Sequence, residues 1–239
     1  DHFHKLFQPL TPGFIHAPAN DLAAFTEIAE KHKLAGILIE CVQGEGGVIA
    51  LDHDFVKGVA DYAKAHDIIM MVDEVQTGNG RTGALYAYMN YGITPDVVST
   101  AKGIGGGLPL GATMLGEKVE NVLGHGDHGS TFGGNPISCA GAVNILSRMD
   151  DAFLAEVKAK GDFIREALKD APGIKSVSGM GLMVGIEVEK PAGEIVRCCI
   201  ERGVLCLTAK EKVRLLPALN IPQNLLAEAI EIIKDACKA

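Results

Sequence analysis

The stretch VDEVQTGNG, residues 72–80, places two adjacent carboxylates directly after an apolar run. The run before them predicts a buried strand, so Asp73 and Glu74 stand at its carboxyl end. A buried carboxylate needs a cationic partner, because removing an unpaired charge from water is costly. A structural alternative is that both carboxylates cap a turn. The pattern therefore indicates either a capped turn or an acidic site that awaits a cation.

Lys102, in STAKGIGGG, follows another apolar run, and four of the five residues after it are glycines. A lysine at a strand end can be partly desolvated, which frees its amine to add to a carbonyl carbon. Glycines let the backbone approach a ligand closely. The alternatives are a solvated loop lysine and a phosphate-binding loop. GIGGGLPLG, however, lacks the G-K-[ST] ending of such a loop and precedes no clear helix.

Asp73 and Lys102 together suit opposite ends of one small molecule. A pyridinium nitrogen would supply the cation that Asp73 lacks, and an aldehyde on the same ring would take the amine of Lys102. A protonated ring nitrogen makes the ring an electron sink, which is the property that pyridoxal phosphate chemistry requires of its protein. The two residue types therefore point to pyridoxal 5'-phosphate as the cofactor.

Helices and strands alternate through the first 150 residues. Apolar spacing predicts helices at 20–34, capped by Asn20, and at 52–66, and continuous apolar runs predict strands at 35–40, 68–75, 96–103 and 111–117. We read residues 35–40 as a strand covered on both faces, residues 1–19 as loop and residues 41–48 as a turn. Such alternation is typical of a mainly parallel sheet, whose ligands bind beyond the carboxyl ends of the strands. Glu40, Asp73 and Lys102 all stand at such ends.

The pattern changes near residue 150. A strongly amphipathic helix at 150–171 precedes short strands, a helix near 191–202 and a final helix at about 222–236. We therefore predict an α/β fold in two parts. Residues 1–149 would belong to a large cofactor-binding domain with helices on both faces of its sheet, and residues 150–239 would form a small α+β domain.

Composition excludes several classes of partner. The net charge of −8 argues against nucleic acid, and the apolar runs are too short to span a membrane. The six cysteines form no C-x-x-C pair, which indicates free thiols in the cytoplasm. His125 and His128 lack further ligands at suitable spacing, so we expect no metal site.

Three motifs, VDEVQTGNGRTG, PDVVSTAKGIGGGLPLGA and GSTFGGNP, resemble in order and spacing those of class III (subgroup II) aminotransferases. The resemblance covers nearly the whole chain and implies the pyridoxal-phosphate-dependent transferase fold of type I. GMGLMVGIEV and GVLCLTAKEKVRLLPALNIP are most similar to acetylornithine aminotransferases of arginine biosynthesis. That likeness implies transfer of an amino group from N2-acetylornithine to 2-oxoglutarate, with glutamate as product. Ornithine, succinylornithine, 4-aminobutyrate and acyl-lysine aminotransferases share the same core and remain alternatives.

The resemblance also implies roles for the cofactor-binding residues. Asp73 would pair with the pyridine nitrogen, Val75 would pack on one ring face, and Gln76 would hydrogen-bond the ring hydroxyl oxygen. Lys102 would hold the cofactor as an aldimine and later move a proton during catalysis. Thr131 would reach the phosphate in a neighbouring subunit, which implies a homodimer with shared active sites.

Substrate contacts follow from the same resemblance. Arg214 matches an arginine that binds a substrate carboxylate, and Glu45 matches a glutamate that pairs with it when no dicarboxylate is bound. Ser130 is expected among the substrate-binding residues. Arg81 is read as a loop or interface residue. Cys41 stands where the family usually has proline, which we expect to affect loop stiffness.

Three features of the family normally lie before the point where this chain begins: a phosphate-cradling loop, an aromatic residue that stacks on the ring, and a second substrate arginine. The chain therefore looks like part of a longer enzyme. An inactive remnant is a second hypothesis, and a nucleotide-binding module that uses the glycine loops is a third.

Overall fold

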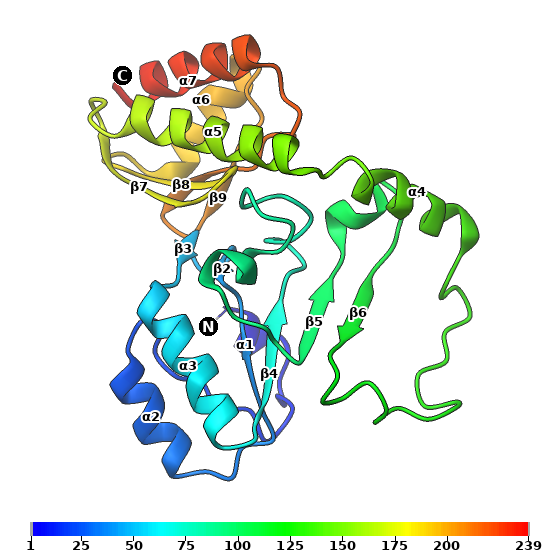
Figure 1. Ribbon diagram of the computed structural model, residues 1–239. Helices are drawn as coiled ribbons and strands as arrows, with labels where there is room; N and C mark the ends of the chain where they lie inside the picture. The colour runs from blue at the N-terminus through cyan, green and yellow to red at the C-terminus, as the bar shows by residue number, and fades with distance from the viewer. Residues whose placement is uncertain (1, 239) are drawn as a thin grey trace.

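The computed structural model describes residues 2–238 as two sheets with helices packed against them (Figure 1). The helices are α1 (His2–Leu6), α2 (Leu22–Glu30), α3 (His53–Ala65), α4 (Pro136–Leu146), α5 (Asp151–Leu168), α6 (Ala192–Glu201) and α7 (Gln223–Lys238), with short 3-10 turns η1 (Ala87–Tyr91) and η2 (Lys102–Gly105). The strands are β1 (Gly36–Ile39), β2 (Val42–Gln43), β3 (Ile49–Ala50), β4 (Ile69–Asp73), β5 (Val97–Thr100), β6 (Ala112–Leu115), β7 (Ile174–Met180), β8 (Met183–Val188), β9 (Leu207–Ala209) and β10 (Lys212–Leu215).

The first sheet has the strand order β1-β4-β5-β6 and is mainly parallel, as the alternation of elements predicts. β1, β4 and β5 run parallel, and β6 runs antiparallel to β5. Helix α3 packs on this sheet because its apolar residues recur at helical spacing and are buried, namely Phe55, Val56, Val59 and Ala63. Together with residues of α2 they form a core with Met70 and Val72, which supports the carboxyl end of β4.

Several local expectations differ from the structure. Asn20 is not the cap of α2; Asp21 is, because its carboxylate accepts a hydrogen bond from the Ala24 N–H at 2.9 Å. Asn20 instead adopts a left-handed backbone conformation, and its side-chain oxygen accepts from the Asp52 N–H at 2.8 Å. Leu38 in β1 is 58% exposed, so the reading of residues 35–40 as covered on both faces is wrong for this side chain.

Two helices and a β-hairpin were not predicted. α1 lies within residues 1–19, which we read as loop, and the short antiparallel hairpin β2–β3 lies around the segment 41–48, which we read as a turn. Helix α4 also went unpredicted. Its sequence PISCAGAVNIL is apolar on every side, so it lacks the periodic stripe that identifies the other helices.

The second sheet is antiparallel, in the order β7-β8-β10-β9. Figure 1 shows α5, α6 and α7 together on one side of this sheet and β3 on its other side. Ile164, Leu168, Ile186, Ile195 and Ile233 are fully buried between the helices and the sheet. The helices expected near 150–171, 191–202 and 222–236 are therefore present. The domain division at 149/150 stays a prediction.

A small apolar cluster joins the two halves of the chain. Val48 from the β2–β3 hairpin packs with Met183 of β8 and Ala209 of β9. Arg81 adds hydrogen bonds to the backbone oxygens of Leu182 at 3.2 Å and Pro217 at 2.6 Å. Burial lowers the pKa of the Arg81 guanidinium to about 10, which leaves it charged at neutral pH. The hairpin and the 73–83 segment are thus fixed against the second sheet.

No helix within residues 2–238 combines the length and the apolar character that crossing a lipid bilayer would need.

Helix α5 approaches the turn between β7 and β8 at Gly161. A Cβ atom at this position would collide with the backbone carbonyl group of Gly181. Because the obstacle is backbone, no side-chain rotation relieves the collision. Gly193, in the first turn of α6, is a matched helical glycine with no atom within 4 Å of an added Cβ.

We expect Gly161→Ala to lower the free energy of unfolding by about 1–3 kcal/mol, because α5 must move away from the sheet. Gly193→Ala should leave stability unchanged or raise it by up to about 1 kcal/mol, since alanine restricts the unfolded chain. Urea unfolding of both variants measures the difference. Equal stabilities would show that the contact between α5 and the β7–β8 turn is not tight.

Candidate active site

The ends of β4 and β5 bring Asp73 and Lys102 to one edge of the first sheet. The parallel register pairs Asp73 with Ser99, and the Glu74 N–H donates to the Ser99 carbonyl at 2.8 Å. Lys102 follows only three residues after Ser99, at the start of η2. The carboxylate and the amine therefore belong to the same corner of the molecule, beyond the carboxyl ends of neighbouring strands.

The two adjacent carboxylates have different surroundings. Glu74 is fully buried and accepts hydrogen bonds from the Thr77 hydroxyl and, at 2.9 Å, from the Tyr88 N–H. Burial raises the pKa of Glu74, and these hydrogen bonds oppose the shift. Glu74 thus holds the loop that follows β4, as the capped-turn reading predicts.

Asp73 is only half-buried. One of its oxygens accepts from the Val75 N–H at 2.8 Å, and no lysine, arginine or histidine of residues 2–238 forms an ion pair with it. The cation that the sequence calls for is therefore not supplied by the described chain.

A third carboxylate, Glu40, is affected by the charges of both Asp73 and Lys102. Burial raises the pKa of Glu40, and the negative charge of Asp73 raises it further. The Gly44 N–H, which donates to Glu40 at 3.1 Å, and the positive charge of Lys102 act in the opposite direction. The charges of Asp73 and Lys102 thus act on Glu40 in opposite directions, as expected for groups at the same edge of the sheet.

Lys102 has an uncommon backbone conformation. Its φ of +47° lies in the left-handed region, which costs a non-glycine residue about 1–3 kcal/mol and is found where the surrounding structure enforces it. The side chain is exposed, so our expectation of a partly desolvated lysine is wrong for the described chain. The exposure follows from its place beside an open cavity.

That cavity has a volume of about 820 Å³ and lies between the glycine-rich loops and the second half of the chain. Val75, Gln76, Asn79 and Lys102 line one side of it, and Phe153 lies among the residues of the other side. The volume lies within the range of about 300–1,000 Å³ that is typical of cofactor and substrate sites. Lys102 therefore has room for a molecule against its amine.

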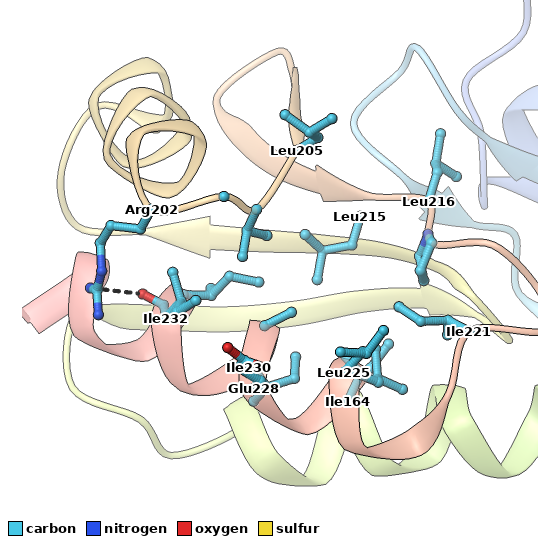
Figure 2. A pocket seen from close by; sticks show the side chains of 16 residues that line it. Ile164, Arg202, Leu205, Leu215, Leu216, Ile221, Leu225, Glu228, Ile230 and Ile232 are labelled. Atoms are coloured by element: carbon cyan, nitrogen blue, oxygen red, sulfur yellow. Dashed lines mark hydrogen bonds between the residues drawn. The ribbon is translucent and has the colours of Figure 1, made fainter.

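A second cavity, of about 480 Å³, lies in the second half beside α7 and β10 (Figure 2). Figure 2 shows leucine and isoleucine side chains around it, with Arg202 at one end donating a hydrogen bond to the Ile232 carbonyl. Arg202 and Glu228 are the charged residues of its otherwise apolar lining, whereas the amine of Lys102 lines the larger cavity, which we therefore take as the candidate site.

Gln76, Glu45 and Arg214 form a polar chain next to the cavity. Arg214 of β10 donates to Glu45 at 2.6 Å, and the two residues are 169 positions apart. The hydrogen bond from Arg214 lowers the pKa of Glu45, with further lowering from Lys102 and Gln76, while burial opposes the shift. Gly44 lies so close to the Gln76 amide that a Cβ there would collide with it. The hairpin thus carries Glu45 across to the second sheet.

Two atoms in this chain of contacts are buried without a partner in residues 2–238. These are the side-chain oxygen of Gln76 and Nε of Arg214. Buried polar atoms are normally hydrogen-bonded, so such atoms beside a cavity indicate a place for a polar ligand.

Ser130 and Thr131 are not brought to this cavity. Both are exposed on the long segment between β6 and α4, and neither lines the cavity. Val75, Gln76 and Lys102 therefore line the cavity, and Asp73 stands at the end of β4, bonded to the Val75 N–H, without lining it. Glu45 and Arg214 are adjacent through Gln76, and the two hydroxyl residues lie outside.

Asn79 is one of several residues of the cavity wall that the sequence analysis did not identify. Asn79 is 4% exposed and hydrogen-bonds to Thr100 and Ala101, the two residues before Lys102. The available signal was the Asn-Gly pair at 79–80, which favours a left-handed turn. That signal indicates a turn but does not reveal which strand the side chain meets.

Comparisons with known proteins identify the family of the chain. The family described as Aminotransferase class-III matches residues 1–237. An acetylornithine aminotransferase of Haemophilus ducreyi is 46% identical over 97% of this chain and 59% of its own length. The chain thus spans about three-fifths of the length of this relative.

Two solved structures share the fold. An acetylornithine aminotransferase from Elizabethkingia anophelis has a TM-score of 0.86 and 32% identity, over 95% of this chain and 62% of its own. An ornithine aminotransferase from Toxoplasma gondii has a TM-score of 0.90 and 31% identity, over 97% of this chain and 58% of its own. The latter is described with partial occupancy of PLP at its active site.

Glu45→Gln tests the ion pair through its pH dependence. Folding lowers the pKa of Glu45 from its ordinary value near 4.5. The ion pair therefore stabilises the fold fully at a pH above 4.5, and this stabilisation is lost as the pH falls through the lowered pKa of the folded state. We expect the variant to lose less than about 1 kcal/mol at pH 7, since the Glu45 side chain is 68% exposed. The difference from wild type should shrink below pH 4.5.

Urea unfolding between pH 3 and pH 7 measures this difference. Glu211→Gln, on the exposed turn between β9 and β10, is the matched control for the loss of one exposed carboxylate. A difference for Glu45→Gln that is constant with pH would contradict the assigned ion pair.

Proposed function

Because the chain belongs to the class III aminotransferases, we propose that the protein moves the terminal amino group of N2-acetylornithine to 2-oxoglutarate, with pyridoxal phosphate as cofactor. The observation that carries the proposal is that Lys102 and Asp73 lie at the same edge of the sheet. Asp73 is a carboxylate that forms no ion pair with a cation of the described chain. Arginine biosynthesis is the pathway that uses this reaction in the family.

The residues present fit this cofactor. Pyridoxal phosphate offers an aldehyde, a basic ring nitrogen and a ring hydroxyl. The site offers a primary amine at Lys102, a carboxylate at Asp73, and at Gln76 an amide whose oxygen is buried without a partner. Each group on the ring thus has a chemically matched side chain among residues close in space, and the cavity of about 820 Å³ is large enough for it.

When bound, the cofactor supplies an electron sink for the negative charge that develops on the substrate carbon. Asp73 holds the proton on the ring nitrogen, because its negative charge favours the protonated form. Val75 would pack against the ring, and Gln76 would hold the ring oxygen. The Lys102 Nζ would hold the cofactor through its aldehyde carbon, with loss of water, and as a free amine it would carry a proton to and from the substrate carbon.

Arg214 and Glu45 account for the use of two substrates at one site. The Arg214 side chain is 8% exposed and that of Glu45 is 68% exposed, so the carboxylate is the partner that can swing away. Arginine presents a planar fork that binds a substrate carboxylate with two hydrogen bonds. Glu45 neutralises Arg214 when the amine donor is bound and leaves it when 2-oxoglutarate or glutamate arrives.

Ser130 and Thr131 enter the proposal through a second subunit. Both lie exposed and away from the cavity of their own chain. We propose that Thr131 binds the cofactor phosphate in a partner and that Ser130 lies near its substrate. A homodimer with shared sites follows from these roles.

A cytoplasmic location is part of the proposal. All six cysteines are free thiols, as expected in a reducing compartment.

Ornithine as the amine donor is a second candidate. The T. gondii ornithine aminotransferase shares the fold over nearly all of this chain. A panel of amine donors, scored by the glutamate that each produces from 2-oxoglutarate, separates the two. N2-acetylornithine should give the highest kcat/KM.

The cofactor assignment is tested by the visible absorbance of protein incubated with pyridoxal phosphate. We expect a band that shifts when N2-acetylornithine is added and is absent in Lys102→Ala, because the amine that binds the aldehyde is gone. Lys31→Ala, which removes an exposed lysine at the C-cap of α2, should keep the band. A colourless wild-type protein would support the inactive-remnant reading, and a band that persists in Lys102→Ala would move the link to another lysine.

The substrate role of Arg214 is tested by steady-state kinetics. Arg214→Lys should raise KM for 2-oxoglutarate by about 10- to 100-fold, because hydrogen bonds to charged groups contribute about 1.5–3 kcal/mol. The lysine keeps the charge but loses the planar fork. An unchanged KM in a variant with the wild-type melting temperature would place the carboxylate elsewhere.

A further inference from the structure

Asn79 connects the loop after β4 to the backbone that presents Lys102. Its amide nitrogen donates to the Thr100 hydroxyl at 3.0 Å and to the Ala101 carbonyl at 3.1 Å. Thr100 is 2% exposed, and Asn79 is 4% exposed, so both hydrogen bonds are shielded from water. These two bonds link the loop after β4 to Thr100 at the end of β5 and to Ala101, the residues immediately before Lys102.

The orientation of the Asn79 amide is fixed by its partners. The Ala101 carbonyl can only accept a hydrogen bond, so the nitrogen and not the oxygen of the amide must face it. The amide oxygen is then left buried without a partner in the described chain. The site therefore tolerates a costly unpaired oxygen in order to keep the two donated bonds.

The segment that Asn79 holds is in an unfavourable conformation. Lys102 has a φ of +47°, whereas Ala101 is extended with a φ of −159°. The Ala101 carbonyl also accepts from the Ile104 N–H at 3.2 Å, which closes the η2 turn. Asn79 itself has a φ of +55°, a region that asparagine enters more readily than most residues.

We propose that Asn79 is a positioning residue that holds the Ala101–Lys102 backbone so that the Lys102 amine meets the cofactor aldehyde. The inference rests on the proposed function, because it assigns to Asn79 the geometry of the same lysine. Asn79 acts through the backbone before Lys102, and it lines the same cavity.

The test uses two substitutions in the full chain. Asn79→Gly removes the amide and keeps a residue that accepts positive φ without strain. Asn79→Asp keeps the size of the side chain but turns a carboxylate oxygen toward the Ala101 carbonyl, where no hydrogen bond forms at neutral pH. Asn20→Gly and Asn20→Asp are matched controls, since Asn20 also has a positive φ of 59° and one side-chain bond to backbone, far along the chain from Lys102.

The first measurement is amide hydrogen exchange in the cofactor-free protein. We expect the Ile104 and Gly106 amides, which close the η2 turn, to exchange at least tenfold faster in both Asn79 variants than in wild type and in the Asn20 controls. The second is the rate of covalent attachment of pyridoxal phosphate to Lys102, followed by visible absorbance and by peptide mass spectrometry after borohydride reduction. We expect at least a tenfold slower rate for the Asn79 variants.

Wild-type rates in both measurements would overturn the inference. Faster exchange with unchanged attachment would also overturn it, because Asn79 would then stabilise the turn without positioning the amine. Failure of the wild-type protein to attach the cofactor would instead contradict the proposed function. In that case faster exchange in the Asn79 variants would support only the hold of Asn79 on the Ala101–Lys102 backbone, and unchanged exchange would overturn the inference as well.

Discussion

The parallel register between β4 and β5 is the constraint on which the site depends. It sets Asp73 beside Ser99, and the hydrogen bond from the Glu74 N–H to the Ser99 carbonyl continues the pairing past the strand end. A shift of one residue would turn Asp73 to the opposite face of the sheet, because side chains alternate along a strand. β4 is anchored by the apolar core beneath α3 through Met70 and Val72, and β5 is held in register by its pairing with β4. Packing far from the cavity thus determines which groups meet inside it.

Charge distribution explains why this corner favours a cationic ring. Glu40, Asp73 and Glu74 lie near one another, and burial raises the pKa of Glu40 and Glu74. Glu74 is occupied by hydrogen bonds within its own loop, whereas Asp73 retains an oxygen with no cation of residues 2–238 beside it. A protonated ring nitrogen would relieve that imbalance. Arg214 and Glu45 balance each other a short distance away, so they leave the charge of Asp73 unmatched.

Local patterns predicted most of the fold. The helical stripe of α5, the apolar run of β4 and the alternation of the first 115 residues are all present in the structure. Helix α4 was not predicted because its own apolar residues occur on all of its faces. The β2–β3 hairpin was not predicted because each of its strands has only two residues. Asn20 was misplaced because neighbouring Asn20 and Asp21 are both good caps, and only the structure shows which one bonds to the helix.

Residue type and position predicted only part of the candidate site. Asp73 and Lys102 were identified from residue type and position at strand ends, whereas the pairing of Glu45 with Arg214 came from a resemblance, since 169 residues separate them. The left-handed backbone of Lys102 and its support by Asn79 depend on a contact between two loops, which no local pattern encodes. The exposure of Lys102 likewise depends on which elements surround the cavity.

A crystal structure of the protein grown with pyridoxal phosphate tests the central claim most directly. We expect the ring nitrogen within about 2.7–2.9 Å of an Asp73 carboxylate oxygen, the separation of a charge-assisted hydrogen bond. The aldehyde carbon of the same molecule should be bonded to the Lys102 Nζ. A cofactor joined to Lys102 with its ring nitrogen turned away from Asp73, or bound through another lysine, would contradict the claim.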